Sequence, residues 1–301
     1  MAGKVMIDCG PGVPAGLLER TEESLREAVD LLERWHGREG GRLRYAFCPR
    51  FAVTCSEPLL REVAALADRY GVHVHTHASE NTGEIAYVQQ DRGMRNVHYL
   101  DQVGLVHEKV VLAHCIHLDD AEIDMMARRQ VHVAHCPSSN LKLASGLAPV
   151  PELLRRGINV GIGADGAACN NNLDGFAEMR LAALIQKPRH GPRAMPAATV
   201  LEMATMGGAR AMGLAHEIGS LEVGKKADLA VVDLTGLHTW PEADIISRLV
   251  YSARGSDVRL TMVDGKILMQ DGHLLTLNTE QVRTDASRSS ERLLRRIGAL
   301  A

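Results

Sequence analysis

The chain has 301 residues, of which 46% are hydrophobic and 24% charged, so it can bury a barrel-sized core together with a small additional unit. Its formal net charge is -3 and its lysines and arginines are scattered, which argues against a nucleic-acid-binding surface. No apolar run approaches the ~20 residues that span a bilayer, and the start lacks a secretory pattern, so we expect a cytoplasmic protein with reduced cysteines.

Short apolar runs rich in β-branched residues recur along the chain and are typical of buried parallel strands. They span residues 4–9, 43–48, 72–78, 109–115, 131–136 and 159–165. Amphipathic segments between them predict helices at 21–35, 58–70, 119–129 and 150–156. Polar residues follow many different strands, and no glycine-rich phosphate loop follows the first strand. This pattern favours a (β/α) barrel over a doubly wound sheet.

The remainder of the chain changes character after Asp165. Residues 174–186 and 197–212 have helical periodicity, and the sequence becomes β-rich from Gly219. The dipeptide Asp264-Gly265 interrupts a strand-like run over 261–268 and predicts a hairpin. We therefore expect a barrel domain over 1–216, a small β-sandwich portion over 217–278, and an amphipathic, arginine-rich C-terminal helix within 279–301.

The side chains with the clearest chemical potential follow three predicted strands. His77 and His114 end two of them, Asp165 ends the last, and Glu80 follows His77 closely. Two imidazoles and a carboxylate at strand ends suit one divalent cation, zinc first and iron second, with a position left for water. Glu80 would then move protons without binding the metal.

A single histidine on a strand is more often a packing residue than a ligand, so each one needs its own argument. His73, His75 and His77 alternate along one strand and share one face, but only His77 lies at its C-terminal end. His114 ends an apolar strand, where a buried imidazole needs a partner. His135 holds the same place one strand later and is a candidate for contact with substrate.

Several longer strings in the sequence resemble the amidohydrolase superfamily. They are HTHASEN, LAHC, AHCPSSNLKLASGLAPVPELL, GIGADGAACNNNLDGFAEMRLA, EMATMGGARAMGL and GSLEVGKKADLAVVDL. The most similar branch contains the S-adenosylhomocysteine, methylthioadenosine and 5'-deoxyadenosine deaminases, the guanine deaminases and the triazine hydrolases. The resemblance covers nearly the whole chain and implies a (β/α)8 TIM barrel of the metal-dependent hydrolase type.

The resemblance also implies roles for individual residues. It makes His77 a metal ligand, Glu80 the proton-shuttling carboxylate, and His114 a group that binds metal or polarises the substrate. It makes Asp165 both a metal contact and the general base.

In the same way, the resemblance places three further residues in the substrate pocket. These residues are His135, Ser139 and Asn140.

The chain departs from the family pattern at its start. The family's first barrel strand carries an H-x-H pair of metal ligands, and no such pair precedes Lys4. We therefore expect this chain to contain strands three to eight of a barrel and an incomplete metal site. By comparison with a typical barrel of this kind, something over ~100 residues would be missing. The uncovered sheet edges favour a homo-oligomer.

A second departure concerns the substrate. Adenosine-type deaminases of this branch usually carry a Pro-His pair after strand four, whereas this chain has Arg50 within CPRFAVTC, as guanine deaminases do. A guanidinium can donate to a purine carbonyl, a ring nitrogen or a carboxylate, but it cannot act as a base. The alternative is that Arg50 is a solvated loop charge.

The expected function is hydrolytic deamination of a purine-type substrate by metal-activated water, with an adenosine-type nucleoside or guanine as substrate. Two alternatives stay open on the sequence: an amidohydrolase acting on a triazine or a cyclic amide, and a catalytically inactive fragment with an incomplete metal site.

Overall fold

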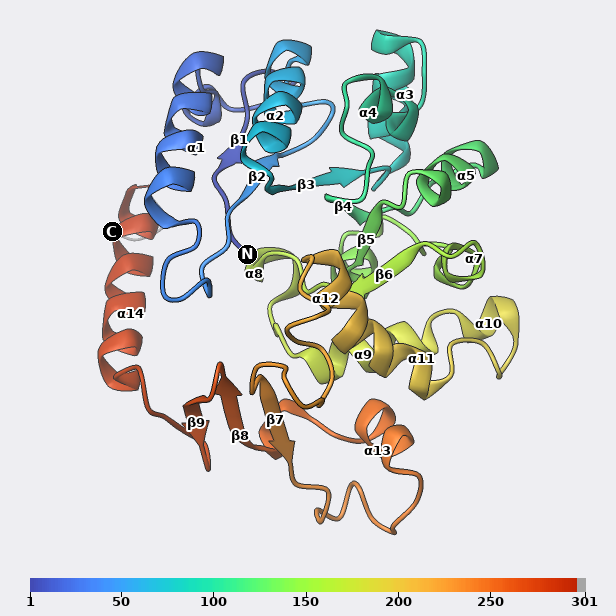
Figure 1. The fold of residues 1–301 in the computed structure, drawn as a ribbon, viewed down its shortest axis with the longest axis vertical. Coiled ribbons are helices and arrows are strands. Elements are labelled where there is room, and N and C mark those ends of the chain that lie inside the picture. The colour runs from blue at the N-terminus through green and yellow to red at the C-terminus, as the bar shows by residue number, and fades with distance from the viewer. Residues whose placement is uncertain (297–301) are drawn as a thin grey trace.

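The computed structural model describes residues 1–296, and its largest element is a six-stranded parallel sheet (Figure 1). Each strand hydrogen-bonds to the next one along the chain. The strands are β1 (Val5–Met6), β2 (Ala46–Pro49), β3 (His73–Ala78), β4 (Val110–His114), β5 (His132–His135) and β6 (Asn159–Ile162). All six overlap the apolar runs that predict them, which confirms the parallel α/β sheet.

Helices connect these strands, and side-chain caps fix where several of them begin. The Ser56 hydroxyl accepts a hydrogen bond from the Leu59 N–H at the start of α2, and Asp119 and Glu122 form a capping box on α5. The connecting helices are η1 (Ala15–Leu17), α1 (Thr21–Trp35), α2 (Glu57–Tyr70), α3 (Thr82–Arg92), α4 (Asn96–Gln102), α5 (Asp120–Arg128), α6 (Pro137–Lys142) and α7 (Val150–Arg155).

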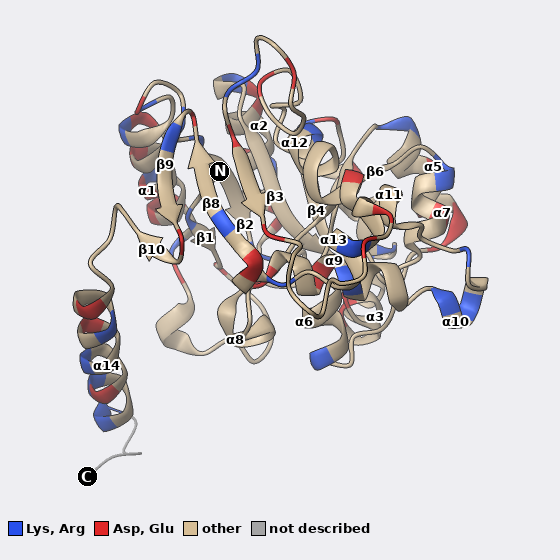
Figure 2. Cartoon of the chain, turned by 90° about the horizontal axis from the view of Figure 1, so that it is seen from below, with Lys and Arg blue, Asp and Glu red and all other residues tan. Residues whose placement is uncertain are grey.

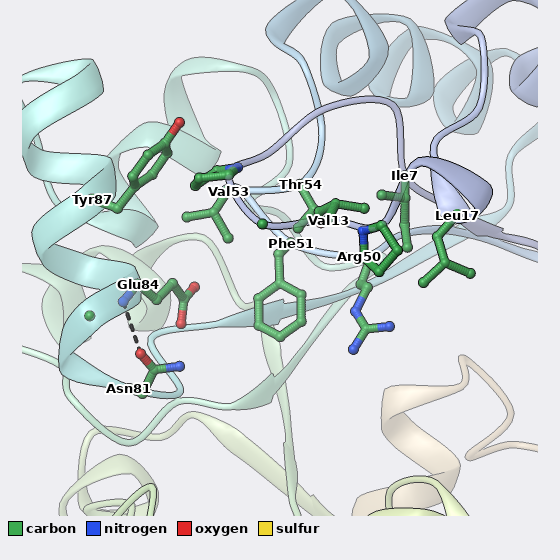
Figure 3. Close-up of a pocket in the computed structure, with 14 residues that line it drawn as sticks. Ile7, Val13, Leu17, Arg50, Phe51, Val53, Thr54, Asn81, Glu84 and Tyr87 are labelled. Atoms are coloured by element: carbon green, nitrogen blue, oxygen red, sulfur yellow. Dashed lines mark hydrogen bonds between the residues drawn. The ribbon is translucent and has the colours of Figure 1, made fainter. Parts of the chain in front are cut away.

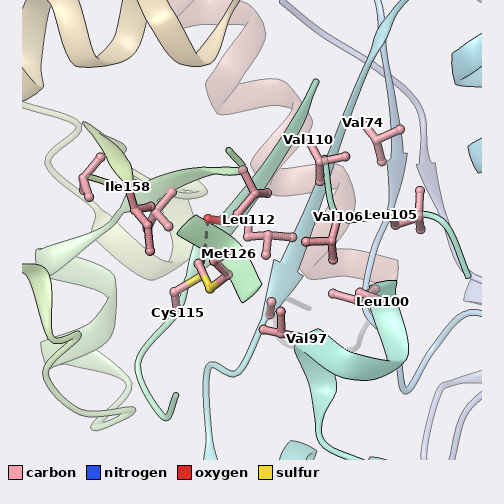
Figure 4. Packing of buried hydrophobic residues seen from close by; sticks show 14 of the residues in the cluster. Val74, Val97, Leu100, Leu105, Val106, Val110, Leu112, Cys115, Met126 and Ile158 are labelled. Atoms are coloured by element: carbon pink, nitrogen blue, oxygen red, sulfur yellow. Dashed lines mark hydrogen bonds between the residues drawn. The ribbon is translucent and has the colours of Figure 1, made fainter. Parts of the chain in front are cut away.

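One face of the parallel sheet forms the hydrophobic core with these helices. Val74, Val110 and Leu112 on β3 and β4 are fully buried. Figure 4 shows them among the buried residues that include Leu100 of α4 and Met126 of α5. Each buried side chain of this size contributes ~1.5–3 kcal/mol, so this layer fixes the helices against the sheet and holds the strand ends in place.

The opposite face of the sheet lines a cavity of about 280 Å³. Its walls include Cys48, His75, Val111, Ala134 and Gly161, which come from five successive strands, β2 to β6. Walls from five strands mean that the sheet curls around this space, as in a barrel. β1 and β6 stand at the two ends of the sheet order, so the six described strands leave the barrel open, whereas a regular one has eight strands.

After β6 the chain is mainly helical, as predicted. The helices are α8 (Ala167–Asn170), α9 (Gly175–Leu184), α10 (Lys187–His190), α11 (Ala197–Glu202), a π-helical turn η2 (Met203–Gly207) and α12 (Gly208–Ala211). The predicted helix over 197–212 therefore contains a wider turn. Gly207 lies against β6 so closely that a Cβ there would come within 2.5 Å of the Val160 carbonyl oxygen.

The second sheet is antiparallel, with the order β10-β9-β8-β7. Its strands are β7 (Leu229–Val232), β8 (Val258–Val263), β9 (Lys266–Gln270) and β10 (His273–Leu274), with α13 (Ile245–Tyr251) and η3 (Gly255–Asp257) between β7 and β8. Asp264 and Gly265 have φ of 50° and 75°, the left-handed values of a tight hairpin, which confirms the predicted turn.

The last helix, α14 (Thr279–Arg296), extends away from the rest of the chain and buries none of its residues (Figure 2). The predicted helix is thus present up to Arg296, and its expected continuation to residue 300 lies outside the described residues. The domain boundaries stay a prediction. Within residues 1–296, no helix is long and apolar enough to cross a membrane.

Candidate active site

The predicted ligands follow the C-terminal ends of the parallel strands. His77 lies near the end of β3, His114 ends β4, and Asp165 follows β6. The φ angles of His114 and Asp165 are 71° and 61°, which non-glycine residues seldom adopt. Left-handed backbone at strand ends is typical of functional sites, because it turns a side chain out of the regular alternation.

The imidazole of His77 is fixed on two sides by the loop after β2. Its Nδ1 lies 2.7 Å from the carbonyl oxygen of Arg50, and its ring stacks on Phe51 with centroids 4.4 Å apart. Since a carbonyl can only accept, Nδ1 carries the proton and Nε2 keeps its lone pair. Burial lowers the pKa of His77 to about 4, so the ring is neutral at physiological pH.

His114 is held in the same manner from a different element. Its Nδ1 lies 2.8 Å from Oδ1 of Asn140 on α6, and its ring stacks with that of His77 at 5.3 Å between centroids. Both rings therefore donate through Nδ1 and keep Nε2 available. This is how histidine ligands are oriented in metal proteins, and the donor set fits a divalent cation.

Asp165 supplies the carboxylate of this group. Its Oδ2 accepts a hydrogen bond from the Ser139 hydroxyl, and its Oδ1 accepts one from the Gly166 N–H at 2.6 Å. Burial raises the pKa of Asp165. The two hydrogen bonds and the nearby His114 and His77 lower it by more than burial raises it, so the pKa lies below its usual value. The carboxylate is therefore charged at neutral pH.

Glu80 lies beside His114, as the proton-transfer role requires. Its Oε2 is 3.8 Å from Nε2 of His114, and its Oε1 accepts a hydrogen bond from the Ser145 hydroxyl at 3.3 Å. The side chain is mostly buried, with 7% of its residue surface exposed. Its carboxylate can therefore reach a group bound at Nε2 of His114.

The three residues predicted to contact substrate lie deeper than that role suggests. Ser139 and Asn140 are buried, and their side chains hold Asp165 and His114 in place. His135 is 0% exposed, and neither of its ring nitrogens has a hydrogen-bond partner among residues 1–296. Direct contact of these residues with substrate stays a prediction.

The ligands present do not by themselves form a closed metal cage. Among residues 1–296, no three His, Cys, Asp or Glu side chains are grouped so that they could hold a metal ion. His77 and His114 nevertheless present their Nε2 atoms, and Asp165 a charged carboxylate, from the ends of strands in the same sheet. The chemistry of these donors fits a divalent cation.

A cavity of about 520 Å³ adjoins this group (Figure 3). Phe51, whose ring stacks on His77, forms part of its wall together with Leu17 and Tyr87. Arg50 also lines the cavity and is exposed, and no carboxylate within the described part of the chain forms an ion pair with it. The cavity thus lies beside the candidate ligands, and its largely apolar wall carries the guanidinium of Arg50 and the carboxylate of Glu84.

Two buried carboxylates that support the site went unnoticed in the sequence. Glu178 on α9 accepts hydrogen bonds from the Ser138 N–H at 3.1 Å and the Asn170 amide at 2.8 Å, which fixes the turn that carries Ser139. Glu84 on α3 accepts two from the loop that carries Glu80. The only sequence signal for Glu178 is its place among apolar residues in GFAEMRLAAL.

The comparisons with known proteins agree on one family. Residues 1–268 match the model of the amidohydrolase family. The 5-methylthioadenosine/S-adenosylhomocysteine deaminase of Moorella thermoacetica is 46% identical over 268 residues, which are 89% of this chain and 63% of the relative. The chain thus spans less than two thirds of that relative's length.

Solved structures give the same result. An adenosine deaminase from Xanthomonas campestris with bound zinc superposes with a TM-score of 0.89 at 37% identity, over 96% of this chain and 64% of that one. The guanine deaminase of E. coli reaches a TM-score of 0.81 at 30% identity, over 89% and 64% respectively. These likenesses confirm the resemblance inferred from the sequence and the barrel-type fold.

Proposed function

Because the chain belongs to the amidohydrolase family, we propose that it is a metal-dependent hydrolytic deaminase of a purine-type substrate. The observation that carries this proposal is the shared orientation of His77 and His114. Each ring donates through Nδ1 to a fixed oxygen and leaves Nε2 free, and Nε2 of His114 lies 3.8 Å from the carboxylate of Glu80. We assign His77, His114 and Asp165 as metal ligands, with zinc preferred over iron.

The proposed reaction adds water to the ring carbon that bears the amino group and releases ammonia, leaving a carbonyl on that carbon. A divalent cation supplies Lewis acidity that makes water acidic near neutral pH. Glu80 takes one proton from the attacking water and delivers it to the ring nitrogen, and Asp165 accepts the second water proton, which then passes through Glu80 to the leaving amine. One of the two water protons thus ends on the ring nitrogen and the other in ammonia, while His114 stabilises the developing charge.

The cavity next to His77 is the proposed place for the substrate. Its apolar wall suits a flat purine ring, and Arg50 offers hydrogen-bond donors to a carbonyl or a ring nitrogen. A purine that carries a ring carbonyl, such as guanine, would use those donors directly. An adenosine-type nucleoside could instead place its non-reacting end, for example the carboxylate of S-adenosylhomocysteine, against the guanidinium.

A second candidate function is a non-catalytic binding or assembly chain. The observation in its favour is that residues 1–296 contain no group of three side chains placed to hold a metal ion. An enzyme acting on a triazine or a cyclic amide would use the same residues as the deaminase. A cytoplasmic location and a homo-oligomeric state complete the proposal.

The experiment that tests the function measures ammonia release by the purified, zinc-loaded chain. The substrates are S-adenosylhomocysteine, 5'-methylthioadenosine and guanine, with a chlorotriazine assayed for chloride, and Glu80→Gln is the matched variant. Ammonia from a purine that falls at least ~100-fold in Glu80→Gln supports the deaminase. No ammonia from any purine by a folded, zinc-loaded chain refutes it, and chloride release alone assigns the triazine activity.

A further inference from the structure

A buried carboxylate, Glu84, lies directly behind the candidate proton-transfer residue. Glu84 belongs to the first turn of α3, and only 5% of its surface is exposed. Helix starts often carry an acidic residue, but that residue normally faces water. Glu84 instead lies on the wall of the cavity beside Asn81 (Figure 3), and its carboxylate binds the loop between β3 and α3, which carries Glu80.

The carboxylate of Glu84 binds the main chain of that loop. Its Oε2 accepts a hydrogen bond from the N–H of Glu80 at 2.8 Å, and its Oε1 accepts one from the N–H of Ser79 at 3.3 Å. The side-chain amide of Asn96, at the start of α4, donates to the same Oε1. One carboxylate thus joins two consecutive peptide groups to a neighbouring helix.

The same loop is held from its other side by the end of β4. The carbonyl oxygen of Ser79 accepts hydrogen bonds from the N–H groups of Ile116 and His117, each at 3.0 Å. Ser79 itself has φ of 53°, a left-handed conformation that a residue with a Cβ adopts at some cost. The peptide before Glu80 is therefore clamped between Glu84 and the segment that follows His114.

Stability alone does not account for a carboxylate at this position. No lysine, arginine or histidine among residues 1–296 forms an ion pair with Glu84, and a buried charge without a cation is costly. A neutral residue in its place would avoid that cost. What the carboxylate provides is two acceptors at a fixed spacing for two adjacent N–H groups.

We propose that Glu84 is a positioning residue, which holds the Ser79–Glu80 peptide so that the Glu80 carboxylate stays beside Nε2 of His114. This inference rests on the proposed function, because the positioned group is the proposed proton carrier. A shift of the loop by about 1 Å would cost ~100-fold in the rate of proton transfer without weakening the binding of substrate.

The test begins with local order, which is measurable without any substrate. Backbone hydrogen exchange is compared between the whole wild-type chain and Glu84→Gln, whose amide group replaces one acceptor by a donor. We expect exchange over residues 78–81 to accelerate at least ~10-fold, with little change elsewhere. Unchanged exchange at 78–81, or equal acceleration along the whole chain, would overturn the proposal.

The matched control is Glu122→Gln. Glu122 is also fully buried and also accepts two main-chain hydrogen bonds, from Val97 and Asp119, together with an ion pair from Arg95, and none of its hydrogen bonds goes to residues 78–81. Its replacement is expected to accelerate exchange near those two residues and to leave 78–81 unchanged. If Glu84→Gln does not fold, Glu84→Asp takes its place. Aspartate keeps the charge, but its shorter side chain moves the carboxylate away from the loop, and the same change in exchange over residues 78–81 is expected.

Kinetics separates this inference from the proposed function. In a chain that releases ammonia, Glu84→Gln is expected to lower kcat ~10- to 100-fold with KM within twofold, whereas Glu122→Gln keeps both. Loss of activity in Glu80→Gln with normal kcat in Glu84→Gln would refute the positioning role alone. Wild-type activity in Glu80→Gln would refute the proposed function, while the exchange result still decides whether Glu84 orders the loop.

Discussion

The Nδ1 atom of His114 lies 2.8 Å from Oδ1 of the buried Asn140. This contact sets which ring nitrogen carries the proton, so Asn140→Ala should free the ring and disorder its Nε2. Loss of such a supporting hydrogen bond typically lowers metal affinity 10- to 100-fold. We expect a decrease of that size in a zinc titration against a competing chelator.

A second Asn–His pair in the same sheet provides the control for this prediction. The amide of Asn159, at the start of β6, lies 3.1 Å from Nδ1 of His132 on β5. Asn159→Ala removes a similar contact at the opposite end of the strands and should leave zinc affinity unchanged. Equal losses in the two variants would mean that general loosening, and not the His114 contact, is responsible.

Arg50 is expected to select the substrate. Replacing Arg50 with Met keeps an apolar stem in the cavity and removes its free positive charge. A hydrogen bond to a charged group contributes ~1.5–3 kcal/mol, so kcat/KM for a substrate bound by the guanidinium should fall ~10- to 100-fold. Steady-state assays with guanine and S-adenosylhomocysteine measure it, and Arg193→Met, at an exposed position, is the control. Unchanged kcat/KM for both substrates would make Arg50 a solvated charge.

Two adjacent glycines, one that ends the π-helical turn and one that begins α12, should respond differently to the same substitution. A Cβ on Gly207 would lie 2.5 Å from the Val160 carbonyl oxygen, whereas a Cβ on Gly208 would meet nothing within 4 Å. Gly207→Ala should therefore lower the free energy of unfolding by ~1–3 kcal/mol. Gly208→Ala should leave it unchanged or raise it by up to ~1 kcal/mol. Urea unfolding measures both, and equal effects would contradict the close contact with β6.

Glu84 should also make stability depend on pH. Burial raises its pKa from 4.5 to about 7, although hydrogen bonds from the N–H groups of Glu80 and Ser79 partly offset that effect. The folded state binds the proton of the Glu84 carboxyl more tightly than the unfolded state does. The protonated Glu84 therefore adds to the free energy of unfolding fully below pH 4.5, and this contribution is lost as the pH rises through 7. The loss amounts to about 3 kcal/mol.

Glu84→Gln cannot titrate and should lack this loss. Between pH 5 and pH 8 the free energy of unfolding of the wild type should therefore fall relative to that of Glu84→Gln. Urea titrations at each pH measure this difference. A difference that stays constant over this interval would show that Glu84 keeps its ordinary pKa.

The sequence predicted the parallel strands well, for a physical reason, and the same pattern singles out the candidate metal ligands, whose role stays a prediction. Strands buried on both faces need continuous apolar runs, and a polar residue at the end of such a run is conspicuous. His77, His114 and Asp165 were found in this way, and the turn at Asp264-Gly265 followed from its backbone requirement. These features depend on local pattern, which a sequence contains.

Features that depend on burial between distant segments could not be predicted. The hydrogen bonds from Ser139 to Asp165 and between Asn140 and His114 join segments far apart in the sequence, and no local pattern indicates them. In the sequence Glu84 looks like any acidic residue in the first turn of a helix. The neighbouring residues do not indicate that Asn96 of α4 lies against it. The π-helical turn likewise results from contact with β6, which lies some forty residues earlier.

The metal content of the purified 301-residue chain, determined by elemental analysis after dialysis, tests the central claim most directly. The variants His77→Ala and Asp165→Ala are measured beside the wild type. The account predicts near-stoichiometric zinc or iron in the wild-type chain and its loss in both variants. A folded wild-type chain without metal, or metal retained equally in both variants, would contradict the assignment of these residues as a catalytic metal centre.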